Sequence, residues 1–282
     1  MPGTLFVVAT PIGNLEDITL RALRVLRTAS IIAAEDTRRT AILLHRYEIS
    51  TPTMSLHEHN ERQRTDALLA RLQVQNESVA LVSDAGTPLI SDPGVRLVRA
   101  AIEAGIRVES VPGPSAVMAA LTVAGVSSDR FTFLGFAPAR AGERARWFDG
   151  LRGETGTLVF FESPQRIRRG LQTLLDILGN RHIALARELT KAHETVTRGW
   201  VSELLAQPLD TRGEYTVVVS DQIQSALGPG HRQTDDEIVS VFCRMTENES
   251  ATPRDAVAAI VREGPRRRQD VYAVLRRAGK LG

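Results

Sequence analysis

The segment LFVVATPIGNLEDIT, residues 5–19, joins an apolar run to a helical pattern through a loop that contains a proline and a glycine. This pattern predicts a strand over residues 5–10 and a following helix that Thr19 caps. In open α/β sheets, ligands bind beyond the carboxyl ends of such strands. The loop has one glycine where a dinucleotide fingerprint has three, and no Walker lysine lies near it. We therefore expect a poor phosphate cradle, although the loop could also be no more than a tight turn.

Short apolar runs and helical patterns continue to alternate as far as residue 124. Helices are predicted over residues 60–72 and 94–105. Strands that are separated by helices indicate crossover connections and a mostly parallel sheet. Residues 1–124 are therefore predicted to form an N-terminal α/β domain, with strands over residues 5–10, 31–34, 53–56, 79–83 and 107–111.

The pattern changes after this domain. The apolar FTFLGF and the basic, small-residue APARAGERAR, within residues 131–147, are predicted to be a mobile connection between domains. A second α/β domain with a mixed sheet is predicted over residues 125–222. A helical C-terminal module is predicted over residues 230–282. The second domain should contain strands over 157–161, 183–186, 195–200 and 215–219 and a helix over 164–178, and the module should contain helices over 235–245, 254–263 and 269–278.

Composition excludes several classes of protein. Cys243 is the only cysteine, which excludes an internal disulfide framework and a cysteine-based zinc site. No apolar stretch approaches the roughly 20 residues of a membrane span, and the N-terminus does not resemble a signal peptide, so we expect a cytoplasmic protein without a membrane segment. The net charge is only +2, but residues 251–282 hold eight Lys and Arg against three Asp and Glu. This local excess favours contact with a polyanion such as RNA.

The loop SDAGTPLISDPG, residues 83–94, is the most specific local signal. Its twelve residues contain two aspartates, two prolines and two glycines directly after a predicted strand. We expect Asp92 to cap the helix that starts at Gly94. The remaining ligand-binding candidates in the loop are Asp84, Ala85, Gly86 and Thr87.

Seven motifs together carry a resemblance to a known family. ATPIGNLEDIT, EDTRRT, LVSDAGTPLISDPG, VPGPSA, FFESPQRI, RELTKAHE and GEYTVVV occur in this order. The chain resembles the ribosomal RNA small-subunit methyltransferase I family, which belongs to the tetrapyrrole-methylase-like (class III) superfamily. The resemblance implies two α/β domains with a ligand cleft between them, S-adenosylmethionine as methyl donor, and 2′-O-methylation of a cytidine in the decoding region of 16S rRNA. It also implies a homodimer.

Two other functions stay open from the sequence. One is a methyltransferase that acts on a tetrapyrrole or another small molecule, and the other is a non-catalytic adenosine-ligand or ribosome-binding factor. The first loop reads TPIG where tetrapyrrole methylases have GxGD, and the late loop reads LTKAHE where they have GT. These departures indicate a different acceptor. The resemblance places donor contacts at Pro11, Ala85, Gly86, Thr87, Ile90, Ser115, Ala116, Glu162 and Leu189. The composition of the loop over residues 83–94 adds Asp84 to the expected donor contacts.

Lys191 is the favoured general base for a ribose hydroxyl. Only two of the 35 basic residues are lysines, and an amine gives up a proton far more readily than a guanidinium. The alternative is that a lysine stands here by chance. Other candidates for acid–base chemistry are Glu188, which could instead pair with Arg187, and Glu35, Asp36, Arg38, His193 and Glu194.

Arginines on two segments are candidates for RNA contact, although an arginine on an exposed helix is often only solvated. His57 and His59 suggest a metal site, but no third ligand is evident, so we expect no catalytic metal. The partner implied is 16S rRNA or the small ribosomal subunit. The RNA-contact candidates are Arg38, Arg39, Arg266, Arg267 and Arg268.

Overall fold

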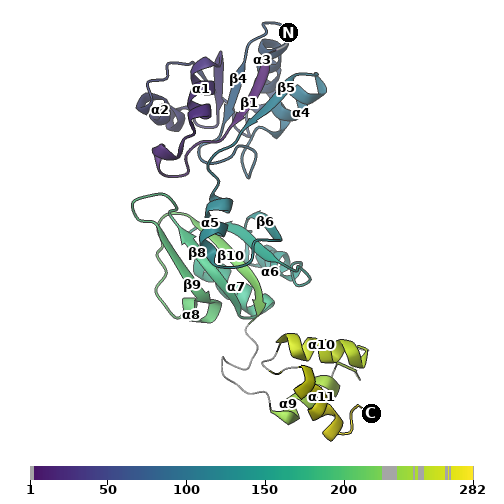
Figure 1. Cartoon of the computed structure of the whole chain (residues 1–282). Coiled ribbons are helices and arrows are strands. Elements are labelled where there is room, and N and C mark those ends of the chain that lie inside the picture. Colours follow the sequence, from purple (N-terminus) through teal and green to yellow (C-terminus); the bar gives the residue numbers. More distant parts are fainter. Residues whose placement is uncertain are drawn as a thin grey trace. The chain divides into compact units, whose positions relative to one another are not determined.

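The computed structural model describes residues 3–223, 234–243, 245–246, 251–263, 266 and 268–281. The chain divides into two units, Met1–Gln222 and Ile223–Gly282 (Figure 1). The first unit contains two five-stranded sheets, and the second unit is helical.

The first sheet is parallel, as predicted. Its strand order is β3-β2-β4-β1-β5, and every recorded pair runs in the same direction. All residues of β2 and β4 are buried, because helices cover both faces of the sheet. The strands are β1 (Thr4–Val8), β2 (Ile31–Ala34), β3 (Thr53–Ser55), β4 (Val79–Val82) and β5 (Arg107–Val111).

Four α-helices form the layers on this sheet. Helices α1 and α2 pack on one face and α3 and α4 on the other (Figure 1). The predicted Thr19 cap is confirmed, since its side chain accepts a hydrogen bond from the Ala22 amide. A short 3₁₀ helix, η1 (Leu15–Asp17), precedes α1 (Leu20–Thr28), α2 (Thr37–Arg46), α3 (Glu61–Gln73) and α4 (Val95–Glu103).

The second sheet is mixed, also as predicted. Its order is β6-β7-β10-β8-β9, with β6 parallel to β7 and antiparallel pairs β7–β10 and β8–β9. Helix α5 (Ala116–Ala124) follows the first sheet in the chain but packs on the second sheet, where Ala120 and Leu121 contact the core of β7, β8 and β10. The other face is covered by α6 (Ala141–Asp149), α7 (Ile167–Leu178) and α8 (Val201–Leu205), and the strands are β6 (Phe131–Phe136), β7 (Thr157–Glu162), β8 (Arg181–Arg187), β9 (Thr195–Trp200) and β10 (Tyr215–Ile223).

The predicted mobile connection over residues 131–147 is wrong. FTFLGF is the edge strand β6, and most of the basic stretch belongs to α6. Arg144 is buried, and its guanidinium donates to the carbonyls of Pro138 and Ala139 at 3.4 and 3.2 Å. Because this arginine satisfies backbone carbonyls inside the domain, its charge does not mark a solvated linker.

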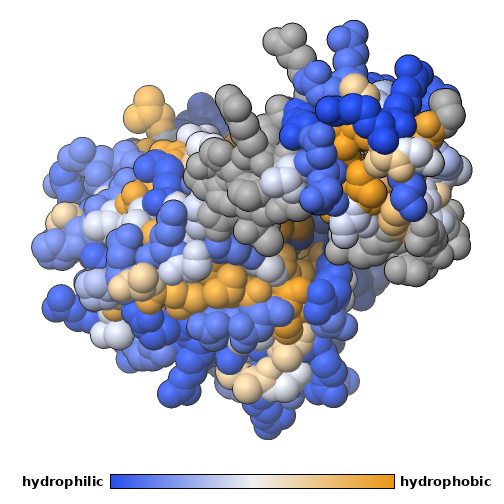
Figure 2. Space-filling model, turned by 90° about the horizontal axis from the view of Figure 1, so that it is seen from below, coloured by the Kyte–Doolittle hydropathy of each residue, from blue (hydrophilic) through white to orange (hydrophobic). Residues whose placement is uncertain are grey.

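The second unit has its own apolar core. Helices α9 (Asp235–Cys243), α10 (Pro253–Glu263) and α11 (Arg268–Arg277) confirm the three predicted helices. Ile238, Phe242, Val257 and Val271 are among the buried residues that hold them together. None of the helices that the structure describes is long and apolar enough to cross a membrane. Figure 2 shows one face of the molecule, on which hydrophilic side chains predominate around a band of apolar ones.

Candidate active site

The loops that follow β1, β4 and β5 are bound to one another. Thr10 and Gly86 form an isolated bridge, in which each amide donates to the other's carbonyl at 2.8 and 3.0 Å. The Thr87 hydroxyl donates to the Pro114 carbonyl at 3.1 Å. Gly86 has a φ of +80°, a conformation that favours glycine. These bonds hold the three loops as one rigid rim at the carboxyl ends of the strands.

A cavity of about 440 Å³ lies against this rim, and loops of both sheets line it. A volume of this size lies within the usual range of small-molecule sites, roughly 300–1,000 Å³. Of the positions predicted to contact the donor, Pro11 is buried and does not line the cavity. The other nine do line it: Asp84, Ala85, Gly86, Thr87, Ile90, Ser115, Ala116, Glu162 and Leu189.

Six carboxylate residues of the described part of the chain line the cavity, and three of them, Glu35, Asp84 and Asp92, come from loops of the first sheet. Burial raises the pKa of Glu35, and it raises the pKa of Asp92 to about 6. The Asp84 carboxylate accepts a hydrogen bond from the Asp36 amide at 2.9 Å and lies 3.4 Å from the Arg39 guanidinium. This acidic wall suits a ligand that carries positive charge, and it is unsuited to a phosphate.

Asp92 is the main site residue that sequence reasoning misplaced. Helix α4 has Gly94 as its N-cap, without a side-chain bond, so the prediction that Asp92 caps it is wrong. Instead, Glu61 of α3 accepts hydrogen bonds from the amides of Gly94 and Arg96 at 3.1 and 2.9 Å. Since a residue far away in the sequence caps the helix, Asp92 is left to line the cavity.

Two aromatic side chains of the second sheet also line the cavity and were missed. Phe136 and Phe161 have ring centroids 5.2 Å apart, and Phe136 is 60% exposed. Such a partly open aromatic surface can pack against a flat ring of a ligand. The signal for Phe136 was present in FTFLGF, but the assignment of that stretch to a linker hid it.

Glu162 is a buried carboxylate at the end of β7. Its Oε1 accepts hydrogen bonds from the Ser163 amide at 2.7 Å and is 2.9 Å from the Arg166 guanidinium. Its Oε2 is buried and has no hydrogen-bond partner in the protein. An unsatisfied buried acceptor is rare. This oxygen lies against Gly170 of α7, where an added Cβ would stand 3.1 Å from it.

Lys191 and Glu188 form an ion pair at the cavity. Lys191 Nζ lies 2.8 Å from Glu188 Oε1, which also accepts from the Glu214 amide at 3.1 Å. Glu188 and Thr190 have positive φ angles of 52° and 66°, an uncommon conformation for residues with side chains. The predicted alternative partner, Arg187, instead pairs with Asp210 at 3.3 Å. The late loop is thus shaped to bring Lys191 and Glu188 together.

The other acid–base candidates have local structural roles. Asp36 is the N-cap of α2 and pairs with Arg38 at 2.7 Å, and these hydrogen bonds lower its pKa. Glu194 accepts from the Thr190 amide at 2.6 Å, and the His193 carbonyl accepts from Arg187 at 3.4 Å. None of the four predicted candidates Asp36, Arg38, His193 and Glu194 lines the 440 Å³ cavity.

The arginines predicted to contact RNA fall in two segments, residues 38–39 and 266–268, and their surroundings differ. Arg38 and Arg39 are 89% and 66% exposed. Arg266 is paired with Asp235 at 2.8 Å, Arg268 is exposed, and Arg267 lies outside the described residues. Among the residues that the structure describes, no group of three His, Cys, Asp or Glu side chains is placed to hold a metal ion.

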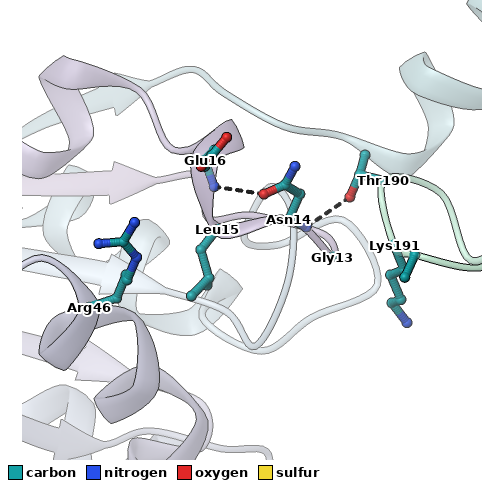
Figure 3. A pocket seen from close by; sticks show the side chains of 8 residues that line it. Gly13, Asn14, Leu15, Glu16, Arg46, Thr190 and Lys191 are labelled. Carbon is teal, nitrogen blue, oxygen red and sulfur yellow. Dashed lines mark hydrogen bonds between the residues drawn. The ribbon is translucent and has the colours of Figure 1, made fainter.

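A second depression, of about 700 Å³, borders the first loop and the late loop (Figure 3). The Asn14 amide donates to the Thr190 hydroxyl at 3.0 Å and so joins the two loops. A side chain at Gly13 would stand 2.4 Å from Lys191 Cγ, so only glycine permits this approach. Among the residues that the structure describes, Lys191 alone lines both the depression and the 440 Å³ cavity.

Comparison with known proteins agrees with this geometry. The family model of Tetrapyrrole (Corrin/Porphyrin) Methylases matches residues 4–205. Ribosomal RNA small subunit methyltransferase I of Escherichia coli O157:H7 is 51% identical over 205 residues, which are 72% of this chain and 71% of that protein. The chain belongs to this methyltransferase family. A crystal structure of diphthine synthase, 15% identical, shares the fold with a TM-score of 0.63 over 78% of this chain and 91% of that one.

The relative from Thermotoga maritima, with the same name, is 47% identical over 223 residues. The match covers 98% of that protein but only 77% of this chain. Nearly a quarter of this chain therefore has no counterpart there. The donor of the family is S-adenosylmethionine, and the 440 Å³ cavity fits it: the carboxylates suit its positive charge and the aromatic surface suits its adenine.

Proposed function

We propose that the chain transfers a methyl group from S-adenosylmethionine to the ribose 2′-hydroxyl of a cytidine in the decoding region of 16S rRNA. The observation that carries this proposal is the position of Lys191, on the boundary between the donor cavity and a second depression that opens beside it. The names of the relatives support rRNA as the acceptor. The cytosol, where such rRNA lies, is the proposed site of action.

Residues of both sheets would hold the donor. The rim formed by residues 84–87, together with Ser115, Glu162 and Leu189, would enclose it. The donor supplies an electrophilic methyl group on a cationic sulfur. Holding this group in line with an acceptor oxygen can contribute about 7 to 11 kcal/mol to lowering the barrier.

Lys191 is the proposed acid–base residue. The Lys191 ammonium that pairs with Glu188 first gives up its proton to water. The amine at Lys191 Nζ then accepts the 2′-hydroxyl proton as the oxygen forms its bond to the methyl carbon. The Glu188 carboxylate, 2.8 Å from Nζ, stabilises the ammonium that results. Such general base catalysis typically contributes about 100-fold to 10,000-fold in rate. The products are a 2′-O-methylated ribose, S-adenosylhomocysteine and one proton, which Lys191 returns to water.

RNA contacts and subunit structure complete the proposal. Arg38 and Arg39 are exposed at the start of α2, next to the cavity residue Glu35, and would contact phosphates of the substrate. Arg266, Arg267 and Arg268 would add phosphate contacts from the second unit. A homodimer would widen the surface that is available to the small subunit.

The acceptor can be identified directly. Labelled S-adenosylmethionine is incubated with undermethylated small subunits, naked 16S rRNA and a porphyrinogen in parallel reactions. Label on a ribose oxygen of the RNA supports the proposal. Label in the porphyrinogen alone would instead favour a tetrapyrrole methyltransferase, and donor binding without any label would favour a non-catalytic binding factor.

A further inference from the structure

The depression beside the first loop, which we call the Arg46 pocket, is lined by parts of three segments. Gly13, Asn14, Leu15 and Glu16 come from the first loop and η1, Arg46 is the last residue of α2, and residues 190–192 come from the late loop. Figure 3 shows Asn14 joined to Thr190 at one side and Arg46 at the other. The inference below rests on the proposed function, because it concerns the RNA substrate of the same active site.

The backbone of this pocket is fixed. Asn14 Oδ1 accepts a hydrogen bond from the Glu16 amide at 3.1 Å, and the Tyr47 hydroxyl donates to the Leu15 carbonyl at 2.8 Å. The Thr190 hydroxyl accepts from the Asn14 amide at 3.0 Å. A ligand would therefore meet a preformed surface, which lowers the entropic cost of binding.

Two charged side chains in the pocket are exposed. Arg46 lies with its guanidinium carbon 5.6 Å from the Tyr47 ring centroid, a contact that limits its orientation without neutralising its charge. Within the part of the chain that the structure describes, neither Arg46 nor Glu16 is in an ion pair. Leu15 adds an apolar side chain to the lining beside Arg46 (Figure 3).

The pocket also adjoins the reacting group. The stem of Lys191 contacts Gly13 in the wall of the pocket, while its Nζ pairs with Glu188 of the donor cavity. Figure 3 shows the Lys191 amine turned away from Asn14 and Glu16. A strand whose acceptor ribose lies at Lys191 Nζ would therefore place its neighbouring nucleotide over the Lys191 stem and into the pocket.

We propose that the Arg46 pocket binds the nucleotide next to the acceptor cytidine in single-stranded RNA, with Arg46 on its phosphate and Glu16 on the amino group of its base. A guanidinium matches a phosphate in charge and hydrogen-bonding geometry. A carboxylate accepts from a base amino group, whereas the one ring donor of uracil, N3–H, lies between two carbonyl oxygens that repel a carboxylate. Glu16 thus selects for an amino-bearing base at this position, and Arg46 holds the strand without regard to sequence.

The test compares kcat/KM for undermethylated small subunits between the parent chain and Arg46→Ala. Arg99→Ala, an exposed arginine of α4 that does not line the pocket, is the matched charge control. We expect a roughly tenfold loss for Arg46→Ala, mainly in KM, as for a charge-assisted contact. In Arg46→Ala, the slope of log kcat/KM against log salt concentration should be less negative by about 0.7 than in the parent. This is the change expected when one phosphate contact to a single strand is lost. Donor affinity should stay as in the parent.

Base selection is tested with Glu16→Gln and subunits that carry each base in turn at the two positions flanking the acceptor. The parent should prefer amino-bearing bases over uracil at one of these positions, and Glu16→Gln should lose most of that preference. If the parent methylates RNA but Arg46→Ala behaves like Arg99→Ala, or if neither flanking base affects the parent, the inference is overturned while the proposed function stands. A parent that places no label in RNA contradicts both.

Discussion

At the scale of single residues, the active site depends on groups whose surroundings change their chemistry. Burial raises the pKa of the Glu35 and Asp92 carboxyl groups, so each loses its proton at a higher pH than an exposed carboxyl group does. Lys191 Nζ lies beside the donor cavity, 2.8 Å from a carboxylate oxygen of Glu188 and 4.0 Å from one of Glu214. The type and approximate place of these residues were readable from the loops, but their partners depend on contacts between distant segments. Glu61, which takes the capping role expected of Asp92, lies in another helix.

Substitution of Lys191 tests its role as a base. Lys191→Ala should lower kcat by about 100-fold or more, with donor affinity nearly unchanged. Lys191→Arg should be almost as impaired, because a guanidinium keeps the positive charge but does not accept a proton at neutral pH. Single-turnover methylation of small subunits measures both. A Lys191→Arg variant with parental turnover would show that the charge, and not proton transfer, is what Lys191 provides.

Asp92 gives a prediction about pH and stability. Its pKa is raised in the folded chain from 3.8 to about 6, so the folded state binds the proton more tightly than the unfolded state. The contribution of Asp92 to the free energy of unfolding is therefore greatest below about pH 4 and falls as the pH rises from about 4 to about 6. Above pH 6 the buried carboxylate lowers the free energy of unfolding. Asp92→Asn should raise the free energy of unfolding at pH 7 by about 1 kcal/mol, after allowance for partial solvent exposure.

Urea unfolding of the parent and Asp92→Asn between pH 4 and pH 7 measures this difference. Asp66→Asn, at an exposed position of α3, is the control and should leave the curve as in the parent. A pH-independent difference between the parent and Asp92→Asn would mean that Asp92 does not titrate in this range.

At the scale of helices, strands and loops, the succession of strands and helices along residues 1–124 was predictable, because each strand ends in a recognisable turn. β2, β5 and β9 match their predicted bounds. The FTFLGF strand was missed because one edge strand next to small and basic residues has the same local pattern as a linker. Strand β6 belongs to the sheet because it pairs with β7. Arg144 is buried by contacts with distant residues, which the local sequence pattern does not indicate.

Gly13 tests how closely the first loop and the late loop must approach. A methyl group in Gly13→Ala would stand 2.7 Å from the Thr190 hydroxyl and 2.9 Å from the Leu189 carbonyl, as well as against Lys191. Because a backbone carbonyl cannot move freely, the late loop should shift and displace Lys191. We expect kcat to fall at least about tenfold, as for a small misplacement of a reacting group.

Thermal unfolding and kcat are measured together for this variant. Gly142→Ala in α6, where an added methyl group meets nothing within 4 Å, is the matched control and should retain parental turnover. Parental turnover in Gly13→Ala would show that the two loops separate during the reaction.

At the scale of the whole molecule, the candidate active site lies within the first unit, and the second unit has a separate core. The match to the Thermotoga maritima relative covers 98% of that protein but only 77% of this chain. A chain that ends at residue 228 should therefore keep donor affinity and the folding of both sheets. Its KM for small subunits should rise by several-fold, and the salt dependence of kcat/KM should weaken, because basic residues of the second unit are lost.

The matched variant changes Arg266, Arg267 and Arg268 together to Ala in the full chain. If neither the truncation nor this variant affects KM or its salt dependence, the second unit takes no part in binding RNA.

The most direct test of the account is a crystal structure of the full chain with bound S-adenosylmethionine. We predict that the donor lies in the 440 Å³ cavity, in contact with Gly86, Ser115 and Leu189, with its methyl group on the side of Lys191. A donor bound elsewhere, or bound there with its methyl group facing away from Lys191, would contradict the account.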